Sequence, residues 1–135
     1  MAQPSNTLEQ IIENIHAGDD STRNKAFEDI IECGSEAIVP LITLLAHTDD
    51  QIRDSAVWAL CQMSNVAGPI LIQELSNKNP LIRESASFCL GICKNTNASQ
   101  ALLLLLKDEN EKVRETAAWS LVKIGVDDEN TVKQI

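Results

Sequence analysis

The chain has 135 residues, 44% hydrophobic but only 3% aromatic, so it is long enough for one domain with an aliphatic core and too apolar to be disordered. Its formal net charge of −9 argues against a protein that binds nucleic-acid phosphates or an anionic membrane surface, because both need a basic footprint. The longest apolar run, at 101–106, is too short to cross a bilayer.

The predicted elements are helices that follow one another in pairs. The first helix opens near Asn6, with Glu9 three residues later in the spacing of a capping box. A short polar turn leads to a second helix, and three further pairs follow, so the hairpins span roughly 7–33, 35–64, 66–94 and 98–125. Residues 127–135 are expected to form a partial closing helix over a leucine ridge that includes Leu104, because an exposed ridge would favour association.

The second helix of each pair repeats one apolar pattern. Its arginines are spaced 30, 30 and 31 residues apart, and an alanine follows each of them by three residues. Further apolar columns recur at steps of four and three residues, which is one stripe of an α-helix and not the alternation of a strand. Four residues before each arginine stands an Asp or Asn, a residue type that caps helix N-termini. The repeated positions are Arg23, Arg53, Arg83 and Arg114, then Ala26, Ala56, Ala86 and Ala117, preceded by Asp19, Asp49, Asn79 and Asn110.

A single hairpin cannot bury its own apolar face, whereas stacked neighbours can, so an all-α solenoid of about four hairpins is predicted. The pattern of paired leucines, a polar turn and then Val/Ile-Arg-x-x-Ala resembles the HEAT repeat, and "VRETAAWSLVKIG" at 113–125 is most similar to the phycobilisome-lyase type. This resemblance covers about 120 residues. It implies a right-handed superhelix with the second helices lining a concave inner face.

The resemblance also implies an Asp six residues before each arginine, forming a ladder between neighbouring repeats. Here that column reads Ala17, His47, Asn77 and Asp108, so the ladder is predicted to be incomplete or moved to the helix caps.

Large aromatic residues recur on the side of the second helices that faces away from the alanine column. At about 100° per residue, a position two places after each alanine points roughly opposite to the core. Aromatic residues outside a core usually indicate contact with a partner, and they are expected to bind it between flanking carboxylates. The predicted partner-binding residues are Asp54, Trp58, Glu84, Phe88, Glu115 and Trp119. A second interpretation remains, in which the three rings only pack on one another.

The cysteines and histidines do not form a recognisable metal or catalytic motif. Cys33 and Cys93 share a core column, while Cys61 and Cys89 fall off that stripe, and there is no C-x-x-C pair of the kind that structural zinc sites use. The sequence therefore predicts no metal site, no disulfide, no cofactor and no catalytic residues. HEAT-like iron hydroxylases use His-Glu pairs, and this chain has none.

Three functions can be compared with these features. The first is a protein-interaction module, an adaptor or scaffold, whose partner carries a basic and apolar patch. The second, implied by the family resemblance, is a subunit that attaches or removes bilin pigment on light-harvesting proteins, which would be lyase-type chemistry. The third, DNA binding as in some HEAT-like glycosylases, conflicts with the acidic charge. The N-terminus lacks the features of a secretory signal, so a cytoplasmic protein with reduced thiols is expected. The oligomeric state and the identity of the partner do not follow from the sequence.

Overall fold

The computed structural model describes residues 7–125, which form eight α-helices and two short 3₁₀ helices and contain no strand. The helices are α1 (Leu8–Ile15), α2 (Asp20–Glu32), α3 (Ile38–Leu44), α4 (Asp50–Gln62), α5 (Ser64–Glu74), α6 (Pro80–Ile92), α7 (Ser99–Leu105) and α8 (Glu111–Ile124). The 3₁₀ helices Gly34–Ala37 and Thr96–Ala98 lead into α3 and α7. The predicted closing helix over 127–135 lies outside the described residues.

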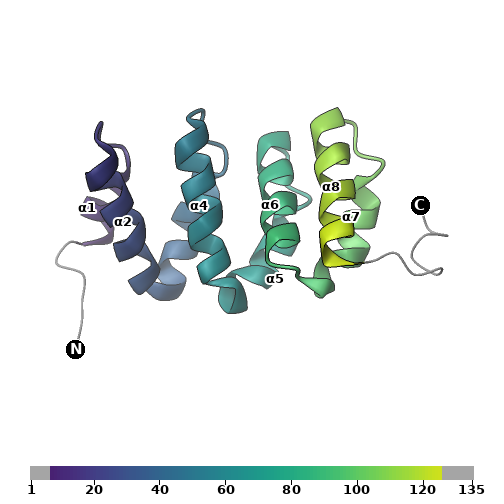
Figure 1. Cartoon of the computed structure of the whole chain (residues 1–135), viewed down its shortest axis with the longest axis horizontal. Helices are drawn as coiled ribbons and strands as arrows, with labels where there is room; N and C mark the ends of the chain where they lie inside the picture. Colours follow the sequence, from purple (N-terminus) through teal and green to yellow (C-terminus); the bar gives the residue numbers. More distant parts are fainter. Residues whose placement is uncertain (1–6, 126–135) are drawn as a thin grey trace.

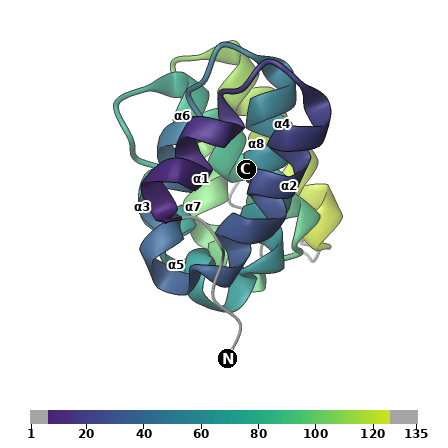
Figure 2. The same cartoon turned by 90° about the vertical axis from the view of Figure 1, so that its left-hand side faces the viewer.

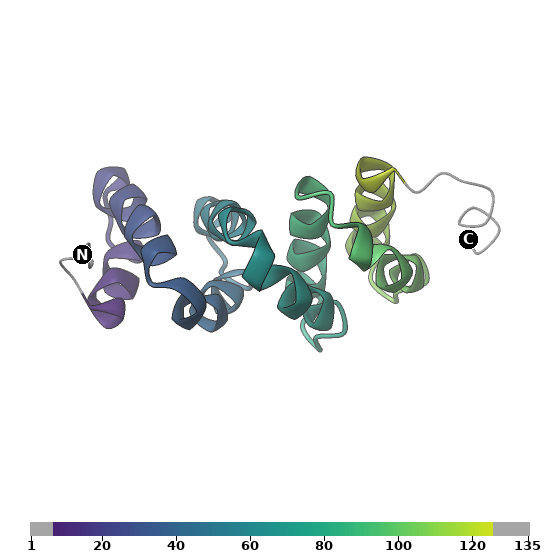
Figure 3. The same ribbon diagram turned by 90° about the horizontal axis from the view of Figure 1, so that it is seen from below.

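The helices form a stack of four hairpins, so the predicted α-solenoid is confirmed. Figure 1 shows the pairs following one another along the long axis of the molecule, and Figure 2 looks along this stack from its N-terminal end. Seen from below, the even-numbered helices form one row and the odd-numbered helices form the other (Figure 3). None of the helices in residues 7–125 combines the length and apolar character needed to span a membrane.

The start signals read from the sequence act as predicted in the second helices. The side chains of Asp19, Asp49, Asn79 and Asn110 each accept a hydrogen bond from a backbone N–H of the first turn. These bonds satisfy donors that have no partner inside the helix. The capping box of α1 lies one residue later than expected, because Thr7 and Gln10 form it, not Asn6 and Glu9. Asn6 itself lies outside the described residues.

The core runs continuously between the two rows of helices. All four alanines of the repeated column are at most 2% exposed, and the apolar column four residues further on is buried too. An alanine at this point lets the second helix of each hairpin approach the first, while leucine and isoleucine fill the space between layers. The buried leucines and isoleucines of the odd-numbered helices are Ile11, Ile15, Ile38, Leu41, Ile42, Leu44, Leu71, Leu102, Leu103 and Leu105, and the residues directly after α3 and α5, Leu45 and Leu75, are buried too.

The arginine column closes the turn inside each of the last three hairpins. Arg53, Arg83 and Arg114 each donate to the backbone carbonyl six residues earlier, at 2.6, 2.8 and 2.7 Å. These carbonyls follow the C-terminus of the preceding helix, where the helix has no donor to offer them. A charged donor held by the next helix therefore ties the two helices of a hairpin together, which explains why arginine recurs at this place.

The predicted ladder between repeats forms at one junction. Arg83 donates from Nε and Nη2 to both carboxylate oxygens of Asp108 in the following hairpin, at 3.0 and 3.1 Å. Arg23 instead bonds the neighbouring repeat through the amide of Gln51, at 2.9 Å. The ladder is incomplete because only Asp108 supplies a carboxylate in the required column.

Candidate functional site

The six predicted binding residues lie on three neighbouring helices of one row. Asp54 and Trp58 belong to α4, Glu84 and Phe88 to α6, and Glu115 and Trp119 to α8. We call this set the aromatic–acidic surface. Trp58 is 47% exposed and Trp119 is 38% exposed, which is unusual for side chains of this size, whereas Phe88 is half-buried. The two tryptophans therefore lie outside the core as the sequence predicts, whereas Phe88 is largely covered.

Phe88 is half-buried because it stacks on Trp119. The two ring centroids are 5.1 Å apart and the planes are inclined by 25°, a geometry that favours an attractive contact between aromatic rings. Lys123, one turn further along α8, places its Nζ 5.4 Å from the centroid of the Trp119 ring. The packing interpretation therefore holds for the stacking of Phe88 on Trp119, and Lys123 adds a cation beside the Trp119 ring.

A hollow of about 400 Å³ opens beside this pair. It is lined by Glu84, Phe88, Glu115, Thr116 and Trp119, so two carboxylates face the same space as two aromatic rings. An apolar group with a positive charge beside it would find both kinds of contact here.

Trp58 stands apart from this pair and faces the preceding repeat. It lines a hollow of about 280 Å³ together with Asn24, Phe27, Glu28 and Ser55, between α2 and α4. Asp54 lines a neighbouring hollow of about 310 Å³ that includes Asp20 and Arg23. The structure therefore divides the predicted surface into two parts, one between α2 and α4 and one between α6 and α8.

The division follows from the residues that separate the helices. Cys61 and Gly91 occupy the same position in successive repeats, five residues after the repeated alanine. Cys89 and Ser120 likewise share a position, three residues after the repeated alanine. A side chain added at Gly91 would lie 2.7 Å from Cβ of Ser120, so α8 approaches α6 closely. At the previous junction two cysteine side chains, with sulfur atoms 3.5 Å apart, fill the equivalent space. The close approach of α8 to α6 stacks Phe88 on Trp119, whereas Trp58 on α4 faces α2 on the other side.

The cysteines are arranged differently from the prediction. Cys89 is fully buried and not off the core, while Cys33 and Cys93 are half-buried. Cys61, Cys89 and Cys93 come together, with all three sulfur atoms within 4.8 Å of one another. A helical wheel gives the direction of each side chain on its own helix, but it does not give contacts between helices of different repeats. Cys61 lies five residues after the repeated alanine of its repeat, and Cys89 lies three residues after the alanine of the next repeat. Comparing these two positions would have indicated that the two cysteines meet.

Comparison with known proteins agrees with the geometry. The HEAT repeat profile matches residues 38–67, and a profile of tandem HEAT repeats matches residues 68–134. No curated protein sequence matches the chain significantly. Human deoxyhypusine hydroxylase matches with a TM-score of 0.58 and 22% identity, over 91% of this chain and 46% of that one. The complex of CpcE and CpcF of phycocyanin lyase from Nostoc sp. matches with a TM-score of 0.53 and 25% identity, over 93% of this chain and 56% of that one. The chain thus spans about half the length of these two proteins.

Proposed function

Because the chain belongs to the HEAT-repeat proteins, we propose that it is a non-catalytic protein-interaction module that binds its partner through the aromatic–acidic surface. In this proposal the surface forms the concave side of the stack. The observation that carries the proposal is the exposure of Trp58 and Trp119, at 47% and 38%, beside carboxylates on the same row of helices.

The chemistry of the surface defines the partner that would fit it. Tryptophan contributes heavily to binding when a partner covers it, since truncation of such a residue costs about 2 kcal/mol or more. The hollow beside Phe88 and Trp119 offers an aromatic wall, and Glu84 and Glu115 line the same space. A protein segment with an apolar side chain next to lysine or arginine would satisfy both. The net charge of −9 would also accelerate the approach of a basic partner.

The experiment compares Trp58→Ala and Trp119→Ala with a matched control. The partner is first isolated by affinity capture, and its Kd is then measured with purified proteins at two salt concentrations. We expect each tryptophan variant to bind about tenfold more weakly or worse, with helical content unchanged. Val39→Ala removes a side chain that is 70% exposed on α3, in the other row, and should bind like the wild type. Equal affinity of all four proteins would refute the proposal.

A second candidate is a bilin-handling subunit of the lyase type, favoured by the similarity to the phycocyanin lyase complex. The hollow beside the stacked rings would then hold part of a flat tetrapyrrole. Mixing the protein with free bilin tests this idea through the absorption spectrum of the pigment. A red-shifted complex that disappears in Trp119→Ala would support it, and an unchanged spectrum would argue against it.

A further inference from the structure

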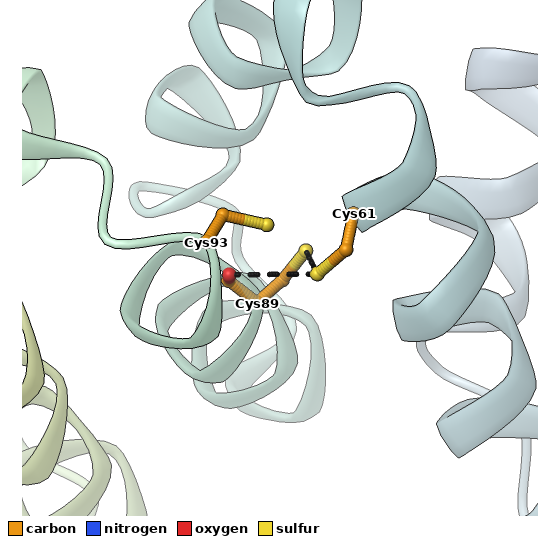
Figure 4. Close-up of side chains that lie close together, drawn as sticks. All are labelled: Cys61, Cys89 and Cys93. Atoms are coloured by element: carbon orange, nitrogen blue, oxygen red, sulfur yellow. Dashed lines mark hydrogen bonds between the residues drawn. The ribbon is translucent and has the colours of Figure 1, made fainter.

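Three cysteines from two repeats meet between α4 and α6. Cys61 lies near the end of α4, Cys89 lies in the last turn of α6, and Cys93 directly follows α6. The sulfur atoms of Cys61 and Cys89 are 3.5 Å apart, and all three sulfurs lie within 4.8 Å of one another. Figure 4 shows the three side chains turned toward the same space between the helices. We call this group the thiol cluster.

The backbone fixes the cluster. Cys89 and Cys93 are four residues apart and so lie on one face at the end of α6. Cys61 reaches them because its position in the repeat faces the Cys89 position of the following repeat, as Gly91 faces Ser120 one repeat later. Both pairings belong to the stacking of the solenoid, so the three sulfurs are held in place without any ligand.

The thiol cluster is partly accessible from solvent. Cys89 is fully buried, whereas Cys61 and Cys93 are half-buried, so the group lies at the edge of the core. Three sulfur atoms this close to one another can all bind one cation once their thiols lose their protons.

We propose that the thiol cluster is a three-coordinate site for a soft metal ion, with Cu(I) as the ion that suits it best. Thiolate ligands select Cu(I), zinc and iron–sulfur clusters over harder ions. A structural zinc site takes four protein ligands, and within residues 7–125 this group contains three cysteines with no histidine or carboxylate. A trigonal site needs only the three sulfurs that the structure provides.

The spacing of the sulfurs is close to that of a loaded site. A metal–sulfur bond of about 2.3 Å in a trigonal arrangement places the sulfurs about 4.0 Å apart. The observed separations, from 3.5 Å to at most 4.8 Å, bracket that value, so side-chain shifts of less than about 1 Å would be sufficient. On binding, each thiol that becomes a ligand loses its proton to solvent, and no oxidant or reductant is consumed.

The test titrates the fully reduced protein with Cu(I), without oxygen and in competition with a Cu(I)-specific chelator that changes absorbance. We expect the wild type to take up one Cu(I) per chain, to gain thiolate-to-copper absorption in the ultraviolet, and to melt at a higher temperature. Cys61→Ser and Cys93→Ser should bind roughly tenfold more weakly or worse. Both residues are half-buried, so the variants are expected to fold, and circular dichroism checks this.

Cys33→Ser is the matched control. Cys33 is half-buried at the end of α2, in the position that corresponds to Cys93 in the first repeat, and it lies outside the thiol cluster. This variant should bind Cu(I) like the wild type. The proposal is overturned if the reduced wild type takes up no Cu(I), if Cys33→Ser weakens binding as much as Cys61→Ser, or if Zn²⁺ displaces Cu(I) from the cluster.

Discussion

At the scale of single residues, the pair formed by Arg83 and Asp108 shows how one carboxylate joins two repeats. Among the described residues it is the only ion pair between neighbouring hairpins, and the two side chains are about 9% and 10% exposed. Partial burial opposes ionisation of Asp108. Hydrogen bonds from Arg83 and from the backbone N–H of Asn110, with the charge of Arg83, outweigh this effect and lower the pKa of Asp108 below 3.8.

Asp108→Asn should therefore destabilise the protein in a pH-dependent way. With a lower pKa in the folded state, the unfolded state binds more protons, so the contribution of Asp108 is complete above about pH 5 and disappears as the pH falls through the folded pKa. We expect a loss of about 1–3 kcal/mol at pH 7, since charge-assisted hydrogen bonds are removed. Urea unfolding of both proteins between pH 7 and pH 3 measures the difference. A difference that stays constant over this range would contradict the assignment.

Ser87 is a second informative residue, because its hydroxyl is buried without a hydrogen-bond partner among the residues that the structure describes. Its carbonyl, in contrast, accepts a bond of 2.5 Å from the hydroxyl of Ser120. Ser87→Ala removes the unpaired group and keeps the backbone contact, so it should leave stability unchanged or raise it by up to about 1 kcal/mol. Thermal unfolding tests this, and a clear loss would show that the hydroxyl has a partner.

At the scale of elements, the distance between neighbouring helices decides what the aromatic residues do. Gly91 lets α8 approach α6, and the approach stacks Phe88 on Trp119. Cys61 occupies the position of Gly91 one repeat earlier, on α4. The aromatic residue of that helix, Trp58, lines a hollow beside α2. A single small residue in the repeat thus changes the surface about one helical turn away.

Gly91→Ala tests this packing. The new Cβ would lie 2.7 Å from Cβ and 2.8 Å from Cα of Ser120, so α8 must move. We expect a destabilisation of about 1–3 kcal/mol, although alanine favours a helix more than glycine does, and a weaker near-ultraviolet signal from the stacked rings. Gly18→Ala is the control, because a Cβ at Gly18 meets nothing within 4 Å and should alter stability by less than about 0.5 kcal/mol. Equal behaviour of the two variants would disprove the close approach.

At the scale of the whole molecule, stability and binding should reside in different columns of the repeat. Ala86 is fully buried, and Ala86→Glu would place an unpaired charge in the core, so this variant should lose most of its cooperative melting. Trp58→Ala should melt close to the wild type, and Trp119→Ala should lose only about 1 kcal/mol with the aromatic stack. Differential scanning calorimetry distinguishes these outcomes. If the tryptophan variants melted as badly as Ala86→Glu, the rings would serve packing alone.

Much of this architecture was predictable because it depends on spacing along one chain. The repeated Arg and Ala columns, the capping residues before them and the amphipathic period all act within a hairpin, and each appears in the structure where the sequence predicted it. The helical wheel also placed Trp58 and Trp119 outside the core, since direction on a helix follows from residue number.

The relation between neighbouring hairpins was decided only by the tertiary structure. The wheel gave Phe88 the same direction as Trp58, but it could not give the distance between α6 and α8, which depends on Gly91 meeting Ser120. It likewise put Cys61 and Cys89 off the core stripe without giving the distance between them, whereas the stacking of repeats brings their sulfur atoms to 3.5 Å. The period and polarity of the sequence determine which side of each helix is buried. Contacts between repeats depend instead on the volumes of the side chains that face each other, and these pairs can be identified only in the stacked structure.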